Sequence, residues 1–145
     1  MTAEGTYHPD SSAVQAHVGI MQGVIQRMAA NSGSCKTWCV TLVAAILVVV
    51  ATKQKPQYGW LALIPILLFV GLDTYYLALE RRFRGSYNAF VTKLHEGKIV
   101  GVDLYTVRPA GSAAGTWLRC LLSWSIWPFH VTLAVTILLA KAVVL

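Results

Sequence analysis

Charged residues are scarce in this chain. Only 12% of its 145 residues are charged and only 6 are acidic, whereas about 25% of an average soluble domain is charged. Because 56% of the residues are hydrophobic and the charges lie in a few places, the composition indicates an integral membrane protein. We expect one compact unit with a few membrane spans and no separate catalytic domain.

Catalytic and metal-binding motifs are also missing. The sequence contains no GxSxG, HExxH or P-loop motif, so we expect neither an enzyme nor a bound cofactor. Cys35, Cys39 and Cys120 are odd in number and form no CxxC motif. This pattern argues against a disulfide framework and a zinc site. We interpret all three cysteines as packing residues.

Three long apolar stretches predict membrane spans. The first is Thr37–Thr52, the second runs from about Gln57 to Leu79, and the third is Cys120–Ala140. About 20 apolar residues cross the hydrocarbon core as a helix, and flanking lysines extend the reach of a shorter stretch. Pro65 should kink the second helix, because it removes a backbone donor.

An amphipathic helix is predicted ahead of the first span. Asp10, Ser11 or Ser12 can cap a helix that runs to about Ala30. The residues of its predicted packing face recur every three or four positions: Val14, His17, Met21, Val24 and Met28. The helix either lies in the membrane interface or packs against a partner helix, and its single arginine slightly favours packing. Asn31-Ser32-Gly33-Ser34 should break or kink it, with Lys36 and Trp38 at the lipid–water boundary.

The second span continues into a one-sided helical pattern. Apolar residues recur at Tyr87, Phe90, Val91 and Leu94, and the pattern stops at Gly97. A helix of forty residues would be about 60 Å long, roughly twice the hydrocarbon thickness. We therefore expect it to leave the bilayer midway. The following residues 99–109 have partial alternation and predict a short strand or an extended arm.

These patterns predict an all-α membrane protein with an N-terminal amphipathic helix and three transmembrane helices, the second extended into the cytoplasm. The expected parts are an N-terminal tail and amphipathic helix (1–36), a transmembrane hairpin (37–80), a basic cytosolic connection (81–116) and a third transmembrane helix (117–145). Because cytoplasmic loops are rich in Arg and Lys, the N-terminus should lie inside and the C-terminus outside. Lys53 and Lys55 in the opposite loop argue mildly against this orientation.

Asp73 is the first candidate functional residue. It follows fifteen apolar or aromatic residues, and a carboxylate near the bilayer centre costs about 3 kcal/mol or more. Because Asp73, Tyr76 and Glu80 share one helical face, they are candidates to line a pore or contact an ion. The alternative is a structural carboxylate that is hydrogen-bonded to Tyr or Thr, or paired with Arg from a neighbouring subunit. The spacing does not decide between these interpretations.

Cations and aromatic rings are interleaved just after this span. Such a surface can hold phosphates by charge and bases by stacking. The candidate ligand-binding residues are Arg81, Arg82, Arg84, Tyr87, Lys93 and Lys98. The alternative is a cluster that only sets the topology and contacts anionic lipid. His130, inside the third stretch, is either a pore or proton-sensing residue or a hydrogen-bonded packing residue.

Two short motifs carry a resemblance to a known group. Before the first span stand Arg27, Met28, Ala29, Asn31, Ser32, Lys36 and Trp38, and the second span ends in Gly71, Leu72, Asp73, Tyr75 and Tyr76. Over roughly residues 20–95 the chain resembles small bacterial membrane effectors of anti-phage systems, in particular a Hailong-type channel effector. The resemblance implies control by a nucleotide-derived signal such as a short DNA oligomer.

Three spans of one chain cannot enclose a hydrated path, so a channel would require a closed homo-oligomer. Our leading hypothesis is an ion channel of the bacterial inner membrane, lined by the second span with Asp73 and gated by a ligand at residues 81–98. The alternative is a membrane anchor or scaffold that recruits a protein partner or anionic lipid. A small multidrug-type transporter is a third and weaker hypothesis.

Overall fold

The computed structural model describes residues 7–143. Along the chain follow α1 (Ser12–Thr52), the 3₁₀ segment η1 (Pro56–Ala62), α2 (Leu63–His95), the 3₁₀ turn η2 (Gly101–Asp103), α3 (Ala113–Leu121) and α4 (Trp127–Val143). Within the described residues all regular structure is helical, which confirms the all-α class.

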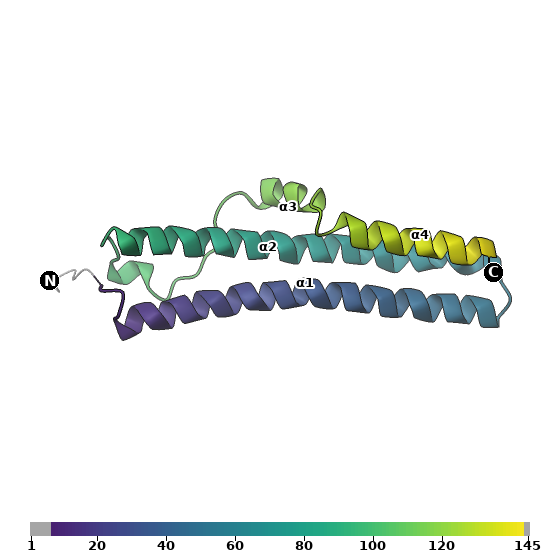
Figure 1. The fold of residues 1–145 in the computed structure, drawn as a ribbon, viewed down its shortest axis with the longest axis horizontal. Helices are drawn as coiled ribbons and strands as arrows, with labels where there is room; N and C mark the ends of the chain where they lie inside the picture. The colour runs from purple at the N-terminus through teal and green to yellow at the C-terminus, as the bar shows by residue number, and fades with distance from the viewer. Residues whose placement is uncertain (1–6, 144–145) are drawn as a thin grey trace.

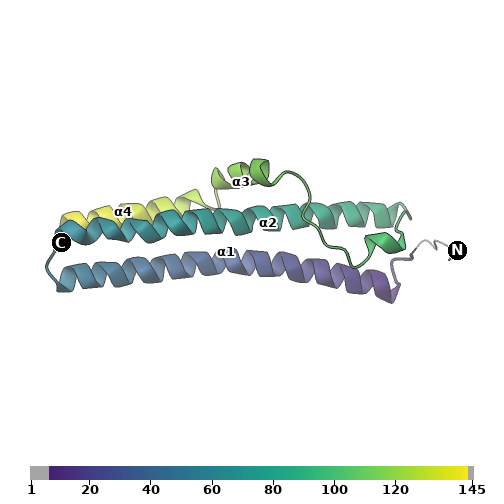
Figure 2. The same ribbon diagram turned by 180° about the vertical axis from the view of Figure 1, so that it is seen from behind.

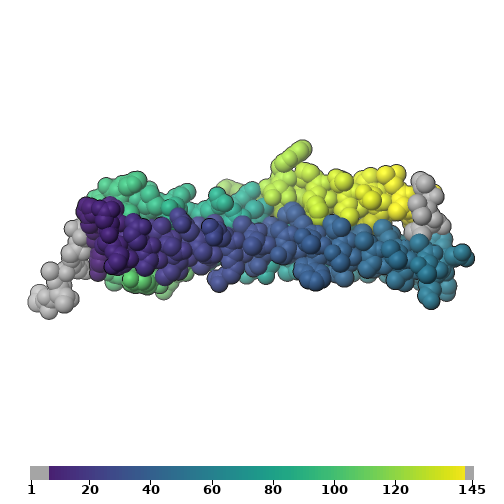
Figure 3. Space-filling view, turned by 60° about the horizontal axis from the view of Figure 1, so that its bottom comes forward, coloured from purple at the N-terminus to yellow at the C-terminus, as the bar shows by residue number. Residues whose placement is uncertain are grey.

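Helices α1 and α2 form one long antiparallel hairpin (Figures 1 and 2). The 41 residues of α1 extend for about 60 Å at 1.5 Å per residue, and the space-filling view shows a rod (Figure 3). Helix α4 lies along the half that contains the hairpin turn, which we call the apolar half (residues 37–72 and 127–143). The opposite half, which carries η2, is called the head (residues 7–31 and 80–110).

Helix α1 is continuous through the stretch that we expected to interrupt it. Ser11 is the N-cap and accepts a hydrogen bond from Val14 N, and the helix then runs without a break through Asn31-Ser32-Gly33-Ser34. The predicted break is therefore wrong. Asn, Ser and Gly each cost a helix only about 0.5–1 kcal/mol relative to Ala, and packing of α1 on α2 outweighs that cost because Ser32 and Cys35 are buried there.

Helix α2 also starts and ends for identifiable reasons. Pro65 is its third residue, because residues 56–62 form the 3₁₀ segment instead. In the first helical turn a missing backbone donor costs nothing, so the predicted mid-span kink at Pro65 is wrong. At the other end, α2 stops at His95 and Gly97 follows with φ +66, which confirms the predicted stop.

The third apolar stretch is not one helix. Helix α3 ends at Leu121, a turn follows, and α4 begins at Trp127 with Pro128 as its second residue. Proline is favoured in the first turn of a helix and disfavoured inside one. The prediction of a continuous span from Cys120 is therefore wrong, and the apolar helix of this region is shorter. Residues 144–145 of the predicted third helix lie outside the described part of the chain.

The segment after α2 covers the head without forming a strand. Residues 99–109 contain η2 and extended backbone, so the predicted strand is wrong and the extended arm is confirmed. Ile99 and Leu104 from this arm pack with Val14, Met21 and Phe90 in a small buried core. The N-terminal part of α1 thus packs against α2 and the arm, which confirms the packing interpretation of the amphipathic helix.

The apolar half keeps most of its hydrophobic side chains exposed. Only 22% of the most apolar window of α1 is buried within the chain, and 39% of the corresponding window of residues 56–95. Val48 is 64% exposed and Leu67 is 75% exposed. Both helical stretches are long and apolar enough to cross a membrane. Their exposure is the opposite of what the core helices of a soluble protein show.

Candidate functional site

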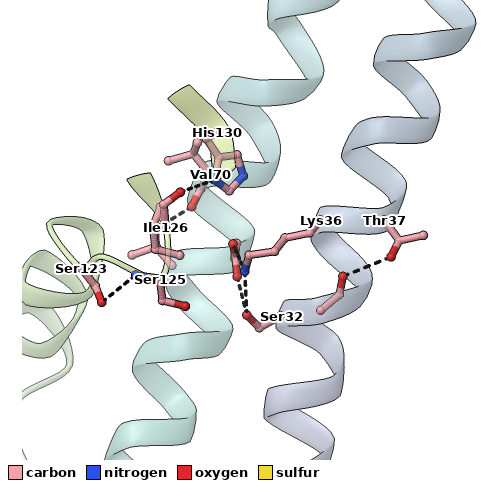
Figure 4. A network of polar contacts seen from close by, with 11 residues as sticks. Ser32, Lys36, Thr37, Val70, Ser123, Ser125, Ile126 and His130 are labelled. Atoms are coloured by element: carbon pink, nitrogen blue, oxygen red, sulfur yellow. Dashed lines mark hydrogen bonds and ion pairs between the residues drawn. The ribbon is translucent and has the colours of Figure 1, made fainter. Parts of the chain in front are cut away.

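Asp73 lies fully buried between the two long helices, with 0% of its surface exposed. Its Oδ1 accepts a hydrogen bond from the Ser32 hydroxyl at 2.5 Å, and the ammonium nitrogen of Lys36 lies 2.5 Å from Oδ2 (Figure 4). The ammonium also lies 3.4 Å from the Ser32 hydroxyl. We call Ser32, Lys36 and Asp73 the junction.

The two partners of Asp73 reach it because of their spacing. Ser32 and Lys36 are four residues apart on α1, and side chains at this spacing lie on one face of a helix. The same face carries Cys35 and Cys39, which are buried. The Lys36 contact is an ion pair by distance, although its angles leave Oδ2 without a well-aligned hydrogen-bond donor among the described residues. Charge neutralisation therefore dominates on that side of the carboxylate.

A bilayer around the apolar half would explain why the junction is neutral. Lys36 is 17 residues from Lys53 at the hairpin turn, which corresponds to about 26 Å of helix. The hydrocarbon core is about 30 Å thick. A bilayer centred on the apolar half would thus place the junction just inside one edge of the hydrocarbon, where an unpaired charge is costly.

The three predicted pore residues do not meet at one surface. Asp73 points between the helices, whereas Glu80 accepts a hydrogen bond from Arg84 at 2.8 Å. Tyr76 lines a separate groove of about 190 Å³ together with Asn31 and Cys35. Asp73 therefore contacts no open path in the single chain. Its partners are a serine and a lysine of the same chain, not the Tyr, Thr or neighbouring Arg suggested by the sequence.

Two of the predicted ligand-binding arginines hold the chain that follows the head. Arg82 donates to the carbonyl oxygens of Ala110 and Gly111 at 2.9 and 3.1 Å, and contacts that of Pro109 at 3.4 Å. Arg81 donates to the Ser123 hydroxyl at 2.8 Å, in the turn between α3 and α4. These guanidinium groups hold residues 109–123, which we call the returning chain, against α2.

The remaining predicted cations also have partners within the chain. Lys93 pairs with Asp103 at 2.9 Å, and Lys98 pairs with Glu96 at 2.7 Å. Tyr87 packs against the head core. The six predicted residues consequently form several separate contacts rather than one continuous cationic surface.

The head nevertheless has two polar grooves. The first, of about 320 Å³, lies between α1 and α2 and combines amide, aromatic, apolar and cationic side chains: Gln22, Ile25, Gln26, Arg84, Tyr87 and Asn88. The second, of about 270 Å³, contains Lys93, Arg108 and Asp103 beside the head core. Arg84 and Tyr87 are thus the two predicted ligand residues that share a groove.

Two titratable groups of the head are shifted from their ordinary behaviour. Burial lowers the pKa of His17, although the nearby Asp103 carboxylate opposes this effect. Nδ1 of His17 accepts a hydrogen bond from the backbone N–H of Tyr105 at 3.0 Å, so that nitrogen is unprotonated. The hydrogen bond from Lys93 lowers the pKa of Asp103. Both shifts belong to contacts that hold the arm on the hairpin.

His130 is a buried polar group of the apolar half (Figure 4). Its Nδ1 donates to the carbonyl oxygen of Ile126 at 2.9 Å, one helical turn earlier. Its Nε2 has no hydrogen-bond partner among the described residues. The ring packs edge-on against Phe129, with centroids 4.9 Å apart. The packing interpretation of His130 therefore accounts for one of its two ring nitrogens.

Ser32 and Lys36 are the site residues that sequence reasoning missed. We interpreted Ser32 as part of a helix break and Lys36 as a cation at the lipid–water boundary. A usable signal was present, because the serine and the lysine stand four residues apart and an antiparallel hairpin brings that face opposite Asp73. The expected break hid this signal, since it interrupted the helical register.

Neither a family model, nor a curated protein, nor a solved structure matches this chain. What the chain does is therefore inferred from its own residues and geometry.

Proposed function

We propose that the chain forms a homo-oligomeric ion channel in the bacterial inner membrane, and that it acts as an anti-phage effector gated by a nucleotide or a short oligonucleotide. The observation that best supports this proposal is the junction. A carboxylate and an ammonium group neutralise each other between the two long helices, and a bilayer around the apolar half would enclose them. If α1 and α2 shift relative to one another, Asp73 becomes a charged group available to a passing cation.

The length of the helices supports coupling between head and pore. Both α1 and α2 run from the head through the junction into the apolar half without interruption. A ligand that binds one arrangement of the head more tightly than another shifts the population of helix positions at Asp73. A loop between the two regions would absorb such a shift, whereas a continuous helix transmits it.

In this proposal three spans per chain surround the path. Helices α1 and α2 each cross the bilayer, and the 17 residues of α4 extend for about 26 Å, enough with slight thinning of the bilayer. The head lies in the cytoplasm. One chain encloses no path, so several copies assemble with closed symmetry.

The groove that contains Arg84 and Tyr87 is the proposed ligand site. A guanidinium group suits a phosphate, a phenol ring suits a stacked base, and the amides of Gln22, Gln26 and Asn88 can hydrogen-bond base edges. A phosphate at Arg84 would compete with Glu80, which pairs with that arginine now. Binding therefore changes a contact only seven residues from Asp73.

Current through planar bilayers tests the channel. Lys36→Met leaves the Asp73 carboxylate unpaired, so we expect a higher open probability or basal current than in the wild type. Asp73→Asn keeps the volume but removes the charge and should change cation selectivity. Lys98→Met, the same substitution in the head, is the matched control and should leave current unchanged. If both junction variants insert normally and conduct like the wild type, Asp73 has no role in conduction.

Ligand control is tested at Arg84 rather than across the whole basic cluster. Charge reversal at Arg81 or Arg82 would detach the returning chain and confuse a folding defect with lost binding. We expect Arg84→Glu to remove the response of the current to nucleotides and short single-stranded DNA. Lys98→Glu, which reverses an exposed head cation outside the groove, should leave the response unchanged. Equal responses in wild type and Arg84→Glu would exclude this groove.

A membrane anchor without a channel is the second candidate. It is favoured by the complete burial of Asp73 and by the use of Arg81 and Arg82 in contacts within the chain. This alternative predicts no current for any variant, while the head still recruits a protein partner or anionic lipid to the membrane.

A further inference from the structure

An apolar groove opens at the hairpin-turn end of the molecule. It lies between the last turns of α1, the segment η1 and the start of α2, and its volume is about 630 Å³. Its walls are formed almost entirely by aliphatic side chains: Leu42, Ala45, Ile46, Val49, Val50, Leu61, Ile64 and Pro65. Because Val49 and Ile64 are 59% and 55% exposed, the groove faces the surroundings of the protein rather than its interior.

Two lysines stand at the end of the groove, in a region without acidic side chains. Lys53, Lys55 and the exposed Tyr58 complete its lining at the hairpin turn. The whole of residues 11–72 and 104–145 contains no acidic side chain, so no carboxylate side chain of the apolar half can neutralise these two lysines. The turn itself is well defined, since Lys53 N and Lys55 N donate to the carbonyl oxygens of Val49 and Val50.

We propose that this groove binds an anionic phospholipid from the leaflet farthest from the head. An acyl chain lies along the aliphatic walls, and the headgroup phosphate is held by the ammonium groups of Lys53 and Lys55, with the Tyr58 hydroxyl beside them. Lysines near a bilayer surface attract anionic lipid electrostatically. By the positive-inside rule, the loop at the hairpin turn would lie outside the cytoplasm and would need no lysines. A lipid site gives a reason for the two lysines that it contains.

Charge favours a lipid over a second copy of the chain as the occupant. A two-fold contact through this face would bring two pairs of lysines together, with no acidic side chain of the apolar half to offset them. A phosphate supplies the missing negative charge, and an acyl chain matches the walls. This inference does not depend on conduction, so it can fail or hold independently of the channel.

The test is the lipid composition retained by the purified protein. The full chain is reconstituted with equal amounts of dioleoyl-phosphatidylglycerol and dioleoyl-phosphatidylcholine, extracted into detergent, and bound lipid per chain is counted by native mass spectrometry. We expect the phosphatidylglycerol to be retained several-fold over the phosphatidylcholine. Lys53→Gln/Lys55→Gln should reduce that ratio to about one, whereas Arg27→Gln/Lys98→Gln, which removes two head cations, should leave it unchanged.

A second variant tests the walls. Ala45→Trp fills the groove and should reduce retention of both lipids, while circular dichroism and elution volume report that the fold is kept. Equal retention of the two lipids by the wild type, or an unchanged ratio in the double lysine variant, would overturn the proposal. So would efficient cross-linking of Val49→Cys between chains in which the native cysteines are replaced by Ala, because a second copy would then cover the groove.

Discussion

The head and the apolar half are built from the same two helices, but they bury opposite kinds of surface. In the head, Val14 and Phe90 are buried against Ile99 of the arm, as water requires of large apolar groups. In the apolar half, Val48 and Leu67 are exposed, as on a helix that faces lipid, which is as apolar as they are. The comparison teaches that one continuous helical seam can cross from one solvent to the other without a change of secondary structure.

The boundary between the two regions is marked by charge rather than by a loop. On the head side, Arg82 and Lys93 make contacts that remain partly exposed to water. On the apolar side, Asp73 is sealed with Lys36 and Ser32. A charged pair thus remains partly exposed to water in the head, whereas at the junction the carboxylate is fully buried.

Breaking the buried ion pair of Lys36 and Asp73 should produce the largest loss of stability. Lys36→Met leaves a buried, unpaired carboxylate, which we expect to destabilise the fold by about 3–5 kcal/mol. Lys36→Met/Asp73→Leu replaces the pair with apolar groups and should recover most of that loss. Denaturant unfolding in detergent micelles measures the free energy of unfolding of the wild type and of both variants. A double variant as unstable as the single one would show that the pair is not the source of the effect.

The same truncation at one buried position of each region tests whether the two regions face different solvents. Ile99→Ala removes a fully buried side chain from the aqueous core of the head and should cost about 3 kcal/mol. Ile66→Ala makes the same change at a buried position of the apolar half and should cost only about 1 kcal/mol, because lipid or detergent offers similar contacts. Equal losses in micelle unfolding experiments would contradict the membrane assignment of the apolar half.

Removing the hydrogen bonds by which Arg82 holds the returning chain should cause an intermediate loss of stability. Arg82→Gln loses the charged donors to the carbonyl oxygens of residues 109–111, and we expect a cost of about 1–2 kcal/mol after allowance for solvent. Hydrogen exchange in residues 105–112 should accelerate. Arg84→Gln, which loses only an exposed pair with Glu80, is the control, and acceleration in both variants alike would refute a specific role of Arg82 in holding the returning chain.

The smallest effect should be a pH dependence confined to the head. The pKa of His17 is lowered by folding, so below its ordinary value of 6.5 the unfolded chain binds more protons than the folded one. Stability should therefore fall as pH drops below about 6.5, and should stop falling once the pH is below the lowered pKa. His17→Gln should flatten this part of the profile. An identical slope in the variant would assign the dependence to another group.

The fold was predictable wherever one helical period continued over many residues. The stripe through Val14 and Met21, the length of the second helix and its stop at Gly97 all follow from local spacing. The wrong predictions concerned Ser32, Pro65 and the third apolar stretch, which contains Pro128. In each case a residue that often ends or interrupts a helix has another use in the structure. Each can interrupt a helix or stand harmlessly in a first turn or on a packed face.

The candidate site was only half predictable for a similar reason. Asp73 is conspicuous because a carboxylate is rare within an apolar run. Its partners are ordinary residues, and a serine and a lysine at a membrane boundary have many uses. Their role depends on which face of α1 lies opposite α2.

By itself, the sequence determined the helical class, the apolar and aqueous regions and the position of the costly carboxylate, since these depend on composition and on the 3.6-residue period. Only the tertiary structure decided that α1 is unbroken, that Lys36 and Ser32 neutralise Asp73, and that Arg81 and Arg82 hold the returning chain. The physical reason is that local preferences of about 1 kcal/mol per residue are outweighed when a helix face packs and a buried charge finds its partner.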